Sequence, residues 1–122
     1  MRMTPAYELH LNRESRVTGK YTSDVKMHSI VTSRSTISIE TLNIPLAATI
    51  DVKLYSCFYS GDPYWNLVEH FSLTASDFPD PDASGKSAYN EAITHPVFPY
   101  TKLVVELGGA TTIFGASVLY GL

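Results

Sequence analysis

The chain has 122 residues, of which 44% are hydrophobic and 17% are charged, and its net charge is −3. A single domain of this length can bury a core without metals or disulfides, and the only cysteine, Cys57, excludes an intramolecular disulfide. Neither the apolar run of a signal peptide nor a stretch as long as a membrane span is found, so we expect a protein made and folded in a cytoplasm.

Short strands are predicted in the first third of the chain. Alternation of apolar and polar side chains indicates them at residues 7–12, 25–31 and 37–40. Between the first two, the polar residues 13–23 predict a loop or a poorly packed hairpin around Gly19. We therefore expect one domain over residues 1–122, in which residues 1–23 form a more extended N-terminal arm.

Residues 50–73 predict a long hairpin around which the rest of the chain is organised. Its first strand alternates, and the apolar members are Ile50, Val52, Leu54 and Phe58. Gly61 and Pro63 mark the turn, because glycine tolerates a positive φ and proline restricts the residue before it. The return strand is not strictly alternate, which predicts a bulge or a twist near Asn66. Its apolar members are Trp65, Val68, Phe71 and Leu73.

The longest loop is expected at residues 74–88, where prolines, a glycine and three aspartates predict an exposed segment. A single helical turn near Ser76–Phe78 is compatible with its sequence. Residues 89–94 then predict a short strand at the edge of a sheet, closed by His95-Pro96.

The last two strands are predicted to form a hairpin. Tyr100–Leu107 and Ala110–Tyr120 flank the pair Gly108-Gly109, which is typical of a two-residue loop between paired strands. The resulting register pairs Leu107 with Ala110, Val105 with Thr112 and Leu103 with Phe114. This register gathers the apolar side chains on one face of the pair, as a half-buried sheet requires.

Seven to nine strands, with no long segment of helical period, predict an all-β protein that is an antiparallel, jelly-roll-like β-sandwich. The expected core consists of Ile50, Val52, Leu54, Phe58, Trp65, Phe71, Leu103, Val105, Leu107, Phe114 and Val118.

No arrangement typical of catalysis or of cofactor binding is found in the sequence. The four histidines lack the spacing of metal ligands, and Asp77, Asp80 and Asp82 lack the spacing of a calcium loop. No nucleophile, base and orienting group stand out together, and Cys57 is typical of a small packing residue. We therefore expect a protein that is not an enzyme and that has no metal and no cofactor.

Aromatic side chains crowd one end of the central hairpin, at Tyr55, Tyr59, Tyr64 and Trp65. In one interpretation Trp65 anchors the core and the tyrosines line a subunit contact. In the other, the aromatic rings stack on sugars, as in a carbohydrate-binding module. Tyr55, Tyr59 and Tyr64 are thus candidates for an aromatic binding or contact surface.

The charges are divided unevenly along the chain. Residues 1–40 carry six basic and four acidic residues, a balance of +2, whereas residues 41–122 carry three lysines and eight acids, a balance of −5. All four arginines lie in the first part. Because a guanidinium can hold a carboxylate through two hydrogen bonds, we expect assembly contacts at Arg2, Arg13, Arg16 and Arg34.

An ordered series of patterns occupies about residues 50–120. It consists of an apolar strand at Val52–Ser56, a turn at Ser60–Asp62, Trp65 with Val68 and Phe71, Pro99-Tyr100 before a strand, and a small-residue turn with a Thr-rich strand at Gly108–Ile113. This series resembles small β-sandwich structural proteins of tailed-phage virions. The resemblance implies a capsid decoration or tail-associated subunit that lies in the virion, forms a homo-oligomer and contacts other virion proteins. We expect no binding to nucleic acid, because the sequence has no basic face with interleaved aromatic residues, and none to a membrane, because it has no apolar run long enough to span one. The alternative is a carbohydrate-binding β-sandwich module.

Overall fold

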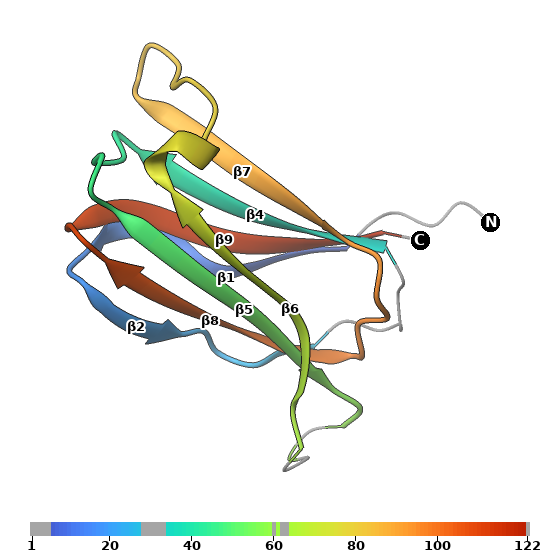
Figure 1. Ribbon diagram of the computed structural model, residues 1–122. Helices are drawn as coiled ribbons and strands as arrows, with labels where there is room; N and C mark the ends of the chain where they lie inside the picture. The colour runs from blue at the N-terminus through green and yellow to red at the C-terminus, as the bar shows by residue number, and fades with distance from the viewer. Residues whose placement is uncertain (1–5, 28–33, 60, 62–63, 122) are drawn as a thin grey trace.

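The computed structural model describes residues 6–27, 34–59, 61 and 64–121, which form two antiparallel sheets packed face to face (Figure 1). The elements are β1 (Ala6–Arg16), β2 (Gly19–Thr22), β3 (Lys26–Met27), β4 (Arg34–Leu42), β5 (Thr49–Cys57), β6 (Asn66–Thr74), the short 3₁₀ helix η1 (Ala75–Asp77), β7 (Lys86–Ile93), β8 (Tyr100–Gly108) and β9 (Thr112–Gly121). We name the sheet with strand order β1-β9-β4-β7 sheet A and the sheet with order β2-β8-β5-β6 sheet B.

The chain folds as one long hairpin wound into two layers. β1 pairs with β9, β2 and β3 pair with β8, β4 pairs with β7, and β5 pairs with β6. Additional pairing of β4 with β9 and of β5 with β8 completes the sheets. This nested arrangement is that of a jelly roll, so the predicted fold class is confirmed. The turn between β5 and β6 is the tip of the nested hairpin, which places residues 50–73 at its centre.

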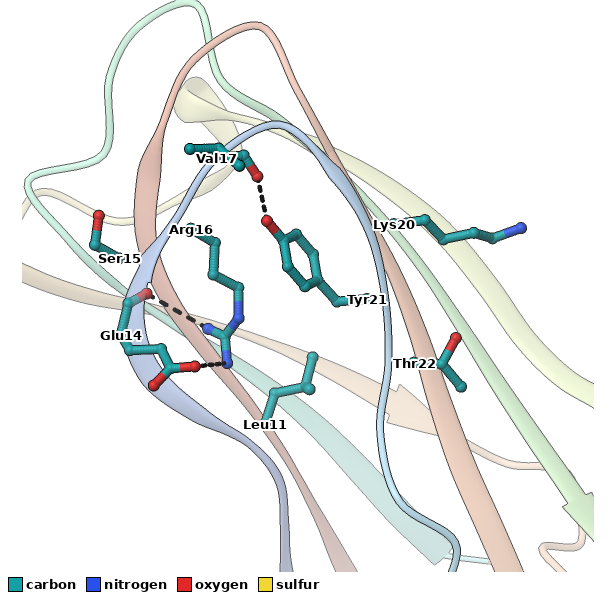
Figure 2. Close-up of a pocket in the computed structure, with 8 residues that line it drawn as sticks. All are labelled: Leu11, Glu14, Ser15, Arg16, Val17, Lys20, Tyr21 and Thr22. Carbon is teal, nitrogen blue, oxygen red and sulfur yellow. Dashed lines mark hydrogen bonds and ion pairs between the residues drawn. The ribbon is translucent and has the colours of Figure 1, made fainter.

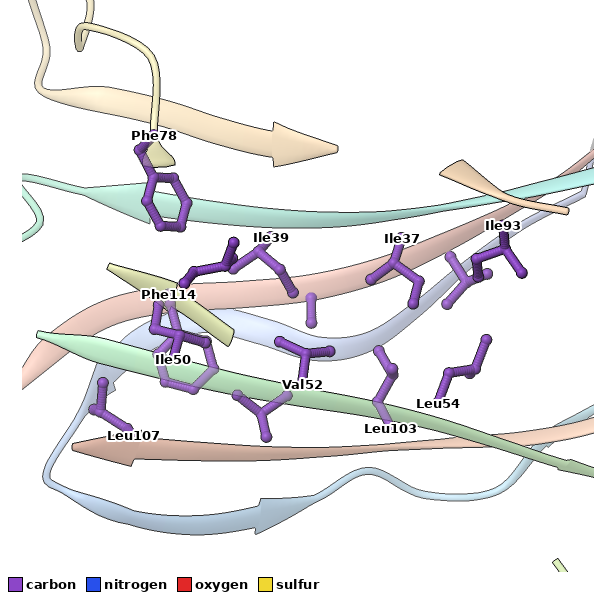
Figure 3. Close-up of a cluster of buried hydrophobic side chains, with 14 of the residues drawn as sticks. Ile37, Ile39, Ile50, Val52, Leu54, Phe78, Ile93, Leu103, Leu107 and Phe114 are labelled. Atoms are coloured by element: carbon purple, nitrogen blue, oxygen red, sulfur yellow. The ribbon is translucent and has the colours of Figure 1, made fainter. Parts of the chain in front are cut away.

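Apolar side chains from the facing sides of the two sheets fill the space between them (Figure 3). Eight of the predicted core residues are fully enclosed: Ile50, Val52, Leu54, Leu103, Val105, Leu107, Phe114 and Val118. Ile37 and Ile39 of β4 join them, since the alternation of that strand also turns one face inward. The regular alternation of the long strands therefore determined most of the core.

Phe58 and Phe71 correct the predicted core. Strand β5 ends at Cys57, so Phe58 leaves the alternating pattern and is 59% exposed. Its ring stacks on that of Phe98, with centroids 4.4 Å apart. Phe71 points toward the core but lies at its margin, because β6 is the edge strand of sheet B, and it is only partly buried.

A shift of register between β5 and β6 explains the position of Trp65. The partners change there from Leu54 with Glu69 to Tyr55 with Leu67. Val68 is therefore an extra residue on β6, which confirms a bulge close to its predicted place at Asn66. A shift by one residue turns the following side chains to the other face of the sheet. The assignment of Trp65 to the core is wrong for this reason, and the half-buried ring lies over the outer face of sheet B.

The predicted final hairpin is also wrong, since β8 and β9 lie in different sheets. β8 lies between β2 and β5 in sheet B, and β9 lies between β1 and β4 in sheet A. The turn at Gly109, with φ of 82°, carries the chain from one sheet to the other. A Cβ at Gly109 would lie 1.8 Å from the Ala47 carbonyl oxygen, so this crossing requires glycine. The predicted inward faces are still buried, because alternation determines the face of a strand and not its partner.

Residues 6–22 lie within the two sheets instead of forming an extended arm. Strand β1 is an edge of sheet A, paired with β9, and β2 is an edge of sheet B, paired with β8. Edge strands expose much of their surface, which accounts for the polar sequence that predicted a loop. The strand expected at residues 25–31 is found at Lys26–Met27, and residues 1–5 and 28–33 lie outside the described residues.

The connection after β6 contains the expected helical turn, η1, followed by the buried Phe78. Strand β7 begins at Lys86, so the loop is shorter than predicted and the edge strand of sheet A is longer. Asp82 Oδ1 accepts hydrogen bonds from the backbone nitrogens of Ser84 and Lys86, at 2.9 and 3.0 Å. The hydrogen bond from the Ser84 hydroxyl, together with these two backbone bonds, lowers the pKa of Asp82.

Candidate functional site

The outer face of sheet B brings aromatic and cationic side chains together. Tyr55 on β5 lies opposite Lys102 on β8, and the shifted register of β6 brings Trp65 to the same side. Lys102 Nζ lies 4.4 Å from the centroid of the Trp65 ring and 5.8 Å from that of the Tyr55 ring. An ammonium at this distance is attracted by the negative face of an aromatic ring. We call these residues the Trp65–Lys102–Tyr55 group.

A shallow depression of about 270 Å³ lies beside this group. The residues that border it, besides the group itself, are Lys20, Thr22, Lys53 and Val104. The registers of β2 and β5 on β8 place Thr22 and Lys53 on opposite sides of Val104. On its face of β8, Val104 is an apolar residue among polar ones. It lines the depression, which accounts for this exception.

An acidic group lies next along the same face. Asp51 Oδ1 accepts hydrogen bonds from His70 Nε2 at 2.8 Å and from the Ser72 hydroxyl at 2.6 Å. Burial alone would raise the pKa of Asp51, but these hydrogen bonds outweigh it and hold the pKa below its ordinary value. The outer face of sheet B is thus divided into a cationic aromatic part and a hydrogen-bonded acidic part.

Arg16, one of the four arginines predicted to make assembly contacts, forms its hydrogen bonds inside its own domain (Figure 2). The side chain is 6% exposed and lines a depression where β1 gives way to β2. Its guanidinium donates to the carbonyl oxygens of Asn12 at 2.8 Å, of Glu14 at 3.4 Å and of Phe114. It also lies 4.7 Å from the Phe114 ring centroid and 5.5 Å from that of Tyr21. Through its hydrogen bond to the Phe114 carbonyl oxygen, Arg16 links β1 to β9.

The other arginines are placed differently. Arg13 on β1 is partly exposed, and Nη1 lies 3.9 Å from Glu40 Oε2 on β4. Arg34 begins β4 and is exposed, while Arg2 lies outside the described residues. Of the three arginines in the described part of the chain, Arg16 is buried in its own domain, and Arg13 contacts Glu40, which is six residues from Arg34 along β4.

Tyr59 and Tyr64 lie in the connection between β5 and β6, which forms one end of the sandwich (Figure 1). Tyr59 is 61% exposed and Tyr64 is 78% exposed. Exposed apolar side chains also occur at this end at Met27, Phe58 and Leu67. Met27 and Cys57 both pair with Tyr100, from opposite sides of β8, so β3 and the end of β5 lie at the same end of sheet B with β8 between them. We call the five residues Met27, Phe58, Tyr59, Tyr64 and Leu67 the apolar end.

Among the described residues, no cluster of three or more His, Cys, Asp or Glu side chains could hold a metal ion. His10 is buried and its Nε2 lies 3.1 Å from Thr101 Oγ1. Cys57 is 1% exposed, in agreement with a packing residue. The described part of the chain also contains no helix long and apolar enough to cross a membrane.

The sequence did not predict the Trp65–Lys102–Tyr55 group. Lys102 lies more than thirty positions from the aromatic cluster, and only the pairing of β5 with β8 brings it to Tyr55. The irregular spacing after Trp65 was the available signal, because a bulge reverses the direction of side chains beyond it. Followed through, it would have moved Trp65 from the core to the outer face.

No protein-family model matches the sequence, and no curated protein sequence matches it. Solved structures match over most of the chain. VP2 of a subviral particle of infectious bursal disease virus matches with a TM-score of 0.56 and 11% identity, over 95% of this chain and 32% of VP2. CBM28, a carbohydrate-binding module specific for non-crystalline cellulose, matches with a TM-score of 0.51 and 10% identity, over 86% of this chain and 69% of that structure.

Both likenesses are likenesses of fold. The chain spans about a third of the length of VP2, at 32%. At these levels of identity the similar structures show a β-sandwich shared with a viral particle protein and with a carbohydrate-binding module. A shared sandwich does not establish a shared role, since one fold carries many functions.

Proposed function

We propose that this protein is a structural subunit of a tailed-phage virion, as a capsid decoration or a tail-associated protein. It acts by self-association and by contacts with other virion proteins, is made in the host cytoplasm and ends in the virion. The apolar end is the observation that carries this proposal. Phe58, Tyr59 and Tyr64 expose 59, 61 and 78% of their surface there. Aromatic side chains are enriched in the cores of protein interfaces, where burial stabilises the complex.

The fold supports this role because it gives the subunit a rigid body. The two sheets share a core in which long strands from both ends of the chain are paired, as β1 is with β9. The likeness of the sandwich to a viral particle protein agrees with the proposal at the level of fold. Arg13 and Arg34 remain candidates for contacts at the rim of the interface, and such charge pairs weaken as salt rises.

The test is native mass spectrometry of the full chain over a range of concentrations. We expect oligomers that the double substitution Tyr59→Ser and Leu67→Thr shifts toward monomer. Leu46→Ser is the matched control, since Leu46 is an apolar side chain with 95% exposure in the loop before β5, at the other end of the sandwich. Unchanged oligomers in the double variant, or equal loss in the control, would remove the apolar end from assembly.

The role that we propose is not catalytic and needs no cofactor. Asp51, His70 and Ser72 lie together, but the imidazole and the hydroxyl both bond to Asp51 Oδ1. In a catalytic triad the imidazole lies between the acid and the nucleophile. We propose likewise that neither nucleic acid nor a membrane is a partner. Turnover of any substrate that disappears with a single side-chain substitution would contradict the non-catalytic role.

A second candidate function is sugar binding, and the Trp65–Lys102–Tyr55 group favours it. The Trp65 and Tyr55 rings lie at the solvent side of a β-sheet beside a shallow depression. An exposed aromatic ring provides an apolar surface of the size of a sugar ring. A virion subunit that binds sugars would join the two functions in one domain. Retention of the protein on polysaccharide gels, lost with Tyr55→Ser and kept with Tyr59→Ser, is the result we expect.

A further inference from the structure

Three lysines from three neighbouring strands border the depression on the outer face of sheet B. Lys20 lies on β2, Lys102 on β8 and Lys53 on β5. Neighbouring strands in a sheet are about 5 Å apart, so the three side chains border the same small area. They are three of the five lysines in a chain whose net charge is −3. Three of the nine basic side chains of the chain therefore border the aromatic depression.

The three ammonium groups are available to a ligand. Among the described residues none of them forms a salt bridge with a carboxylate. Of the acids on this face, Asp51 accepts hydrogen bonds from His70 and Ser72 and also attracts Lys53 through space, and Glu106 lies opposite Lys20 at the far end of the row. Lys102 is held over the Trp65 ring at 4.4 Å, which fixes the position of its charge. An anion that pairs with Lys102 thus comes to lie beside the aromatic rings.

We propose that this depression binds an acidic sugar, a saccharide unit that carries a carboxylate or a sulfate. The inference rests on sugar binding as the second candidate function above, and it specifies the class of sugar. The apolar face of the sugar ring packs against Trp65 and Tyr55, and the acidic group pairs with Lys102 and Lys53. Both requirements are met only by a ligand that combines an apolar face with a negative charge. Held in place before binding, Lys102 loses little conformational freedom when the ligand arrives.

A short acidic saccharide fits this site better than a nucleic acid does. Binding of nucleic acid usually depends on a basic stripe that follows many phosphates. Here the positive area is a single depression, and the same face continues into Asp51 and Glu106. The experiment must therefore distinguish binding of nucleic acid from binding of an acidic sugar.

The experiment is affinity electrophoresis of the full chain in gels that contain one polymer each. The polymers are polygalacturonate, which carries carboxylates, heparin, which carries mainly sulfates, neutral hydroxyethyl cellulose, and single-stranded DNA. We expect retardation by polygalacturonate or heparin that weakens as salt is added. Lys53→Gln and Lys102→Gln should each reduce the affinity for that polymer about tenfold, the effect of losing one charge-assisted contact.

The matched control is Lys86→Gln, which removes an exposed lysine from β7 of the other sheet and changes the net charge equally. Equal effects of Lys53→Gln and Lys86→Gln would overturn the site. Retention by the neutral polymer as strong as by the acidic ones would overturn the acidic class while sugar binding stands. No retention by any polysaccharide would overturn both, and tighter retention by DNA with the same dependence on Lys53 would overturn the sugar ligand.

Discussion

His10 Nε2 and Thr101 Oγ1 lie 3.1 Å apart in the interior, and this contact joins sheet A to sheet B. His10 belongs to β1 and Thr101 to β8. Thr101 Oγ1 also lies 2.7 Å from the hydroxyl of Tyr120 on β9. A register shift beside His10 marks a bulge in β1, and bulges redirect side chains. A polar link of this kind specifies how the two layers align, because buried polar groups require their partners.

Thr101→Val should destabilise the protein although the side chain keeps its shape. The loss removes one partner from each of His10 and Tyr120 inside the core, at a cost of about 1–3 kcal/mol. Urea denaturation measures the change in the free energy of unfolding. Thr111→Val is the matched control, since Thr111 is exposed. Equal stability of the two variants would show that the link contributes nothing.

Val105→Ala and Val104→Ala compare the two faces of β8. Val105 is 0% exposed and packs in the core, whereas Val104 is half-buried on the outer face. Both lose the strand preference of valine, but only Val105→Ala also leaves a cavity. We expect it to cost about 1–3 kcal/mol, clearly more than Val104→Ala, in thermal and denaturant unfolding. The reverse order would contradict the assignment of the faces.

Arg16→Lys should destabilise the protein despite retaining the charge. A lysine cannot donate from a planar fork to the three carbonyl groups that Arg16 reaches. We expect a loss of about 2–3 kcal/mol in the free energy of unfolding. Arg13→Lys is the matched control on the same strand. Its partner, Glu40, is 3.9 Å away at the surface, so a change below about 0.5 kcal/mol is expected.

Gly115→Ala should strain the pairing of β1 with β9. A Cβ at Gly115 would lie 2.7 Å from the backbone nitrogen of Arg13 and 3.0 Å from the carbonyl oxygen of Leu11. Backbone atoms cannot swing aside as a flexible side chain does, so β1 must shift, at a cost of about 1–3 kcal/mol. Faster exchange of β1 amide hydrogens would show this shift by nuclear magnetic resonance. Unchanged protection there would contradict the close approach.

Tyr89 should titrate at unusually high pH. Its hydroxyl donates to Glu91 Oε2 at 2.5 Å, and this bond, with burial, raises the pKa of Tyr89 from 10.0 to about 12. Because folding favours the protonated phenol, its contribution to stability is complete below pH 10.0 and is lost as the pH rises toward 12. Ultraviolet absorbance of the phenolate measures the titration, and Tyr89→Phe identifies it.

Glu91→Gln removes the negative charge and replaces the carboxylate acceptor of the Tyr89 hydrogen bond, the strongest cause of the shift, with a weaker amide acceptor. The titration that Tyr89→Phe abolishes should therefore move toward ordinary values in Glu91→Gln. An unchanged titration in this variant would show that burial, and not the carboxylate, sets the pKa of Tyr89.

The sequence by itself determined which face of each long strand is buried. In β5, Ile50, Val52 and Leu54 alternate with polar side chains, and a period of two admits only one inward face. The same argument placed Leu103 and Phe114 correctly, although their strands were predicted to pair with each other. Fold class followed from these faces, because two half-apolar sheets must cover one another.

Only the tertiary structure decided which strands are neighbours and which side chains meet. Local alternation holds no information on whether β8 pairs with β9 or with β5, since both arrangements bury the same residues. The extra residue at Val68 then turned Trp65 outward, and pairing of β5 with β8 brought Lys102 to the face of its ring. The Trp65–Lys102–Tyr55 group is thus a product of long-range strand pairing, which short-range patterns in the sequence do not specify.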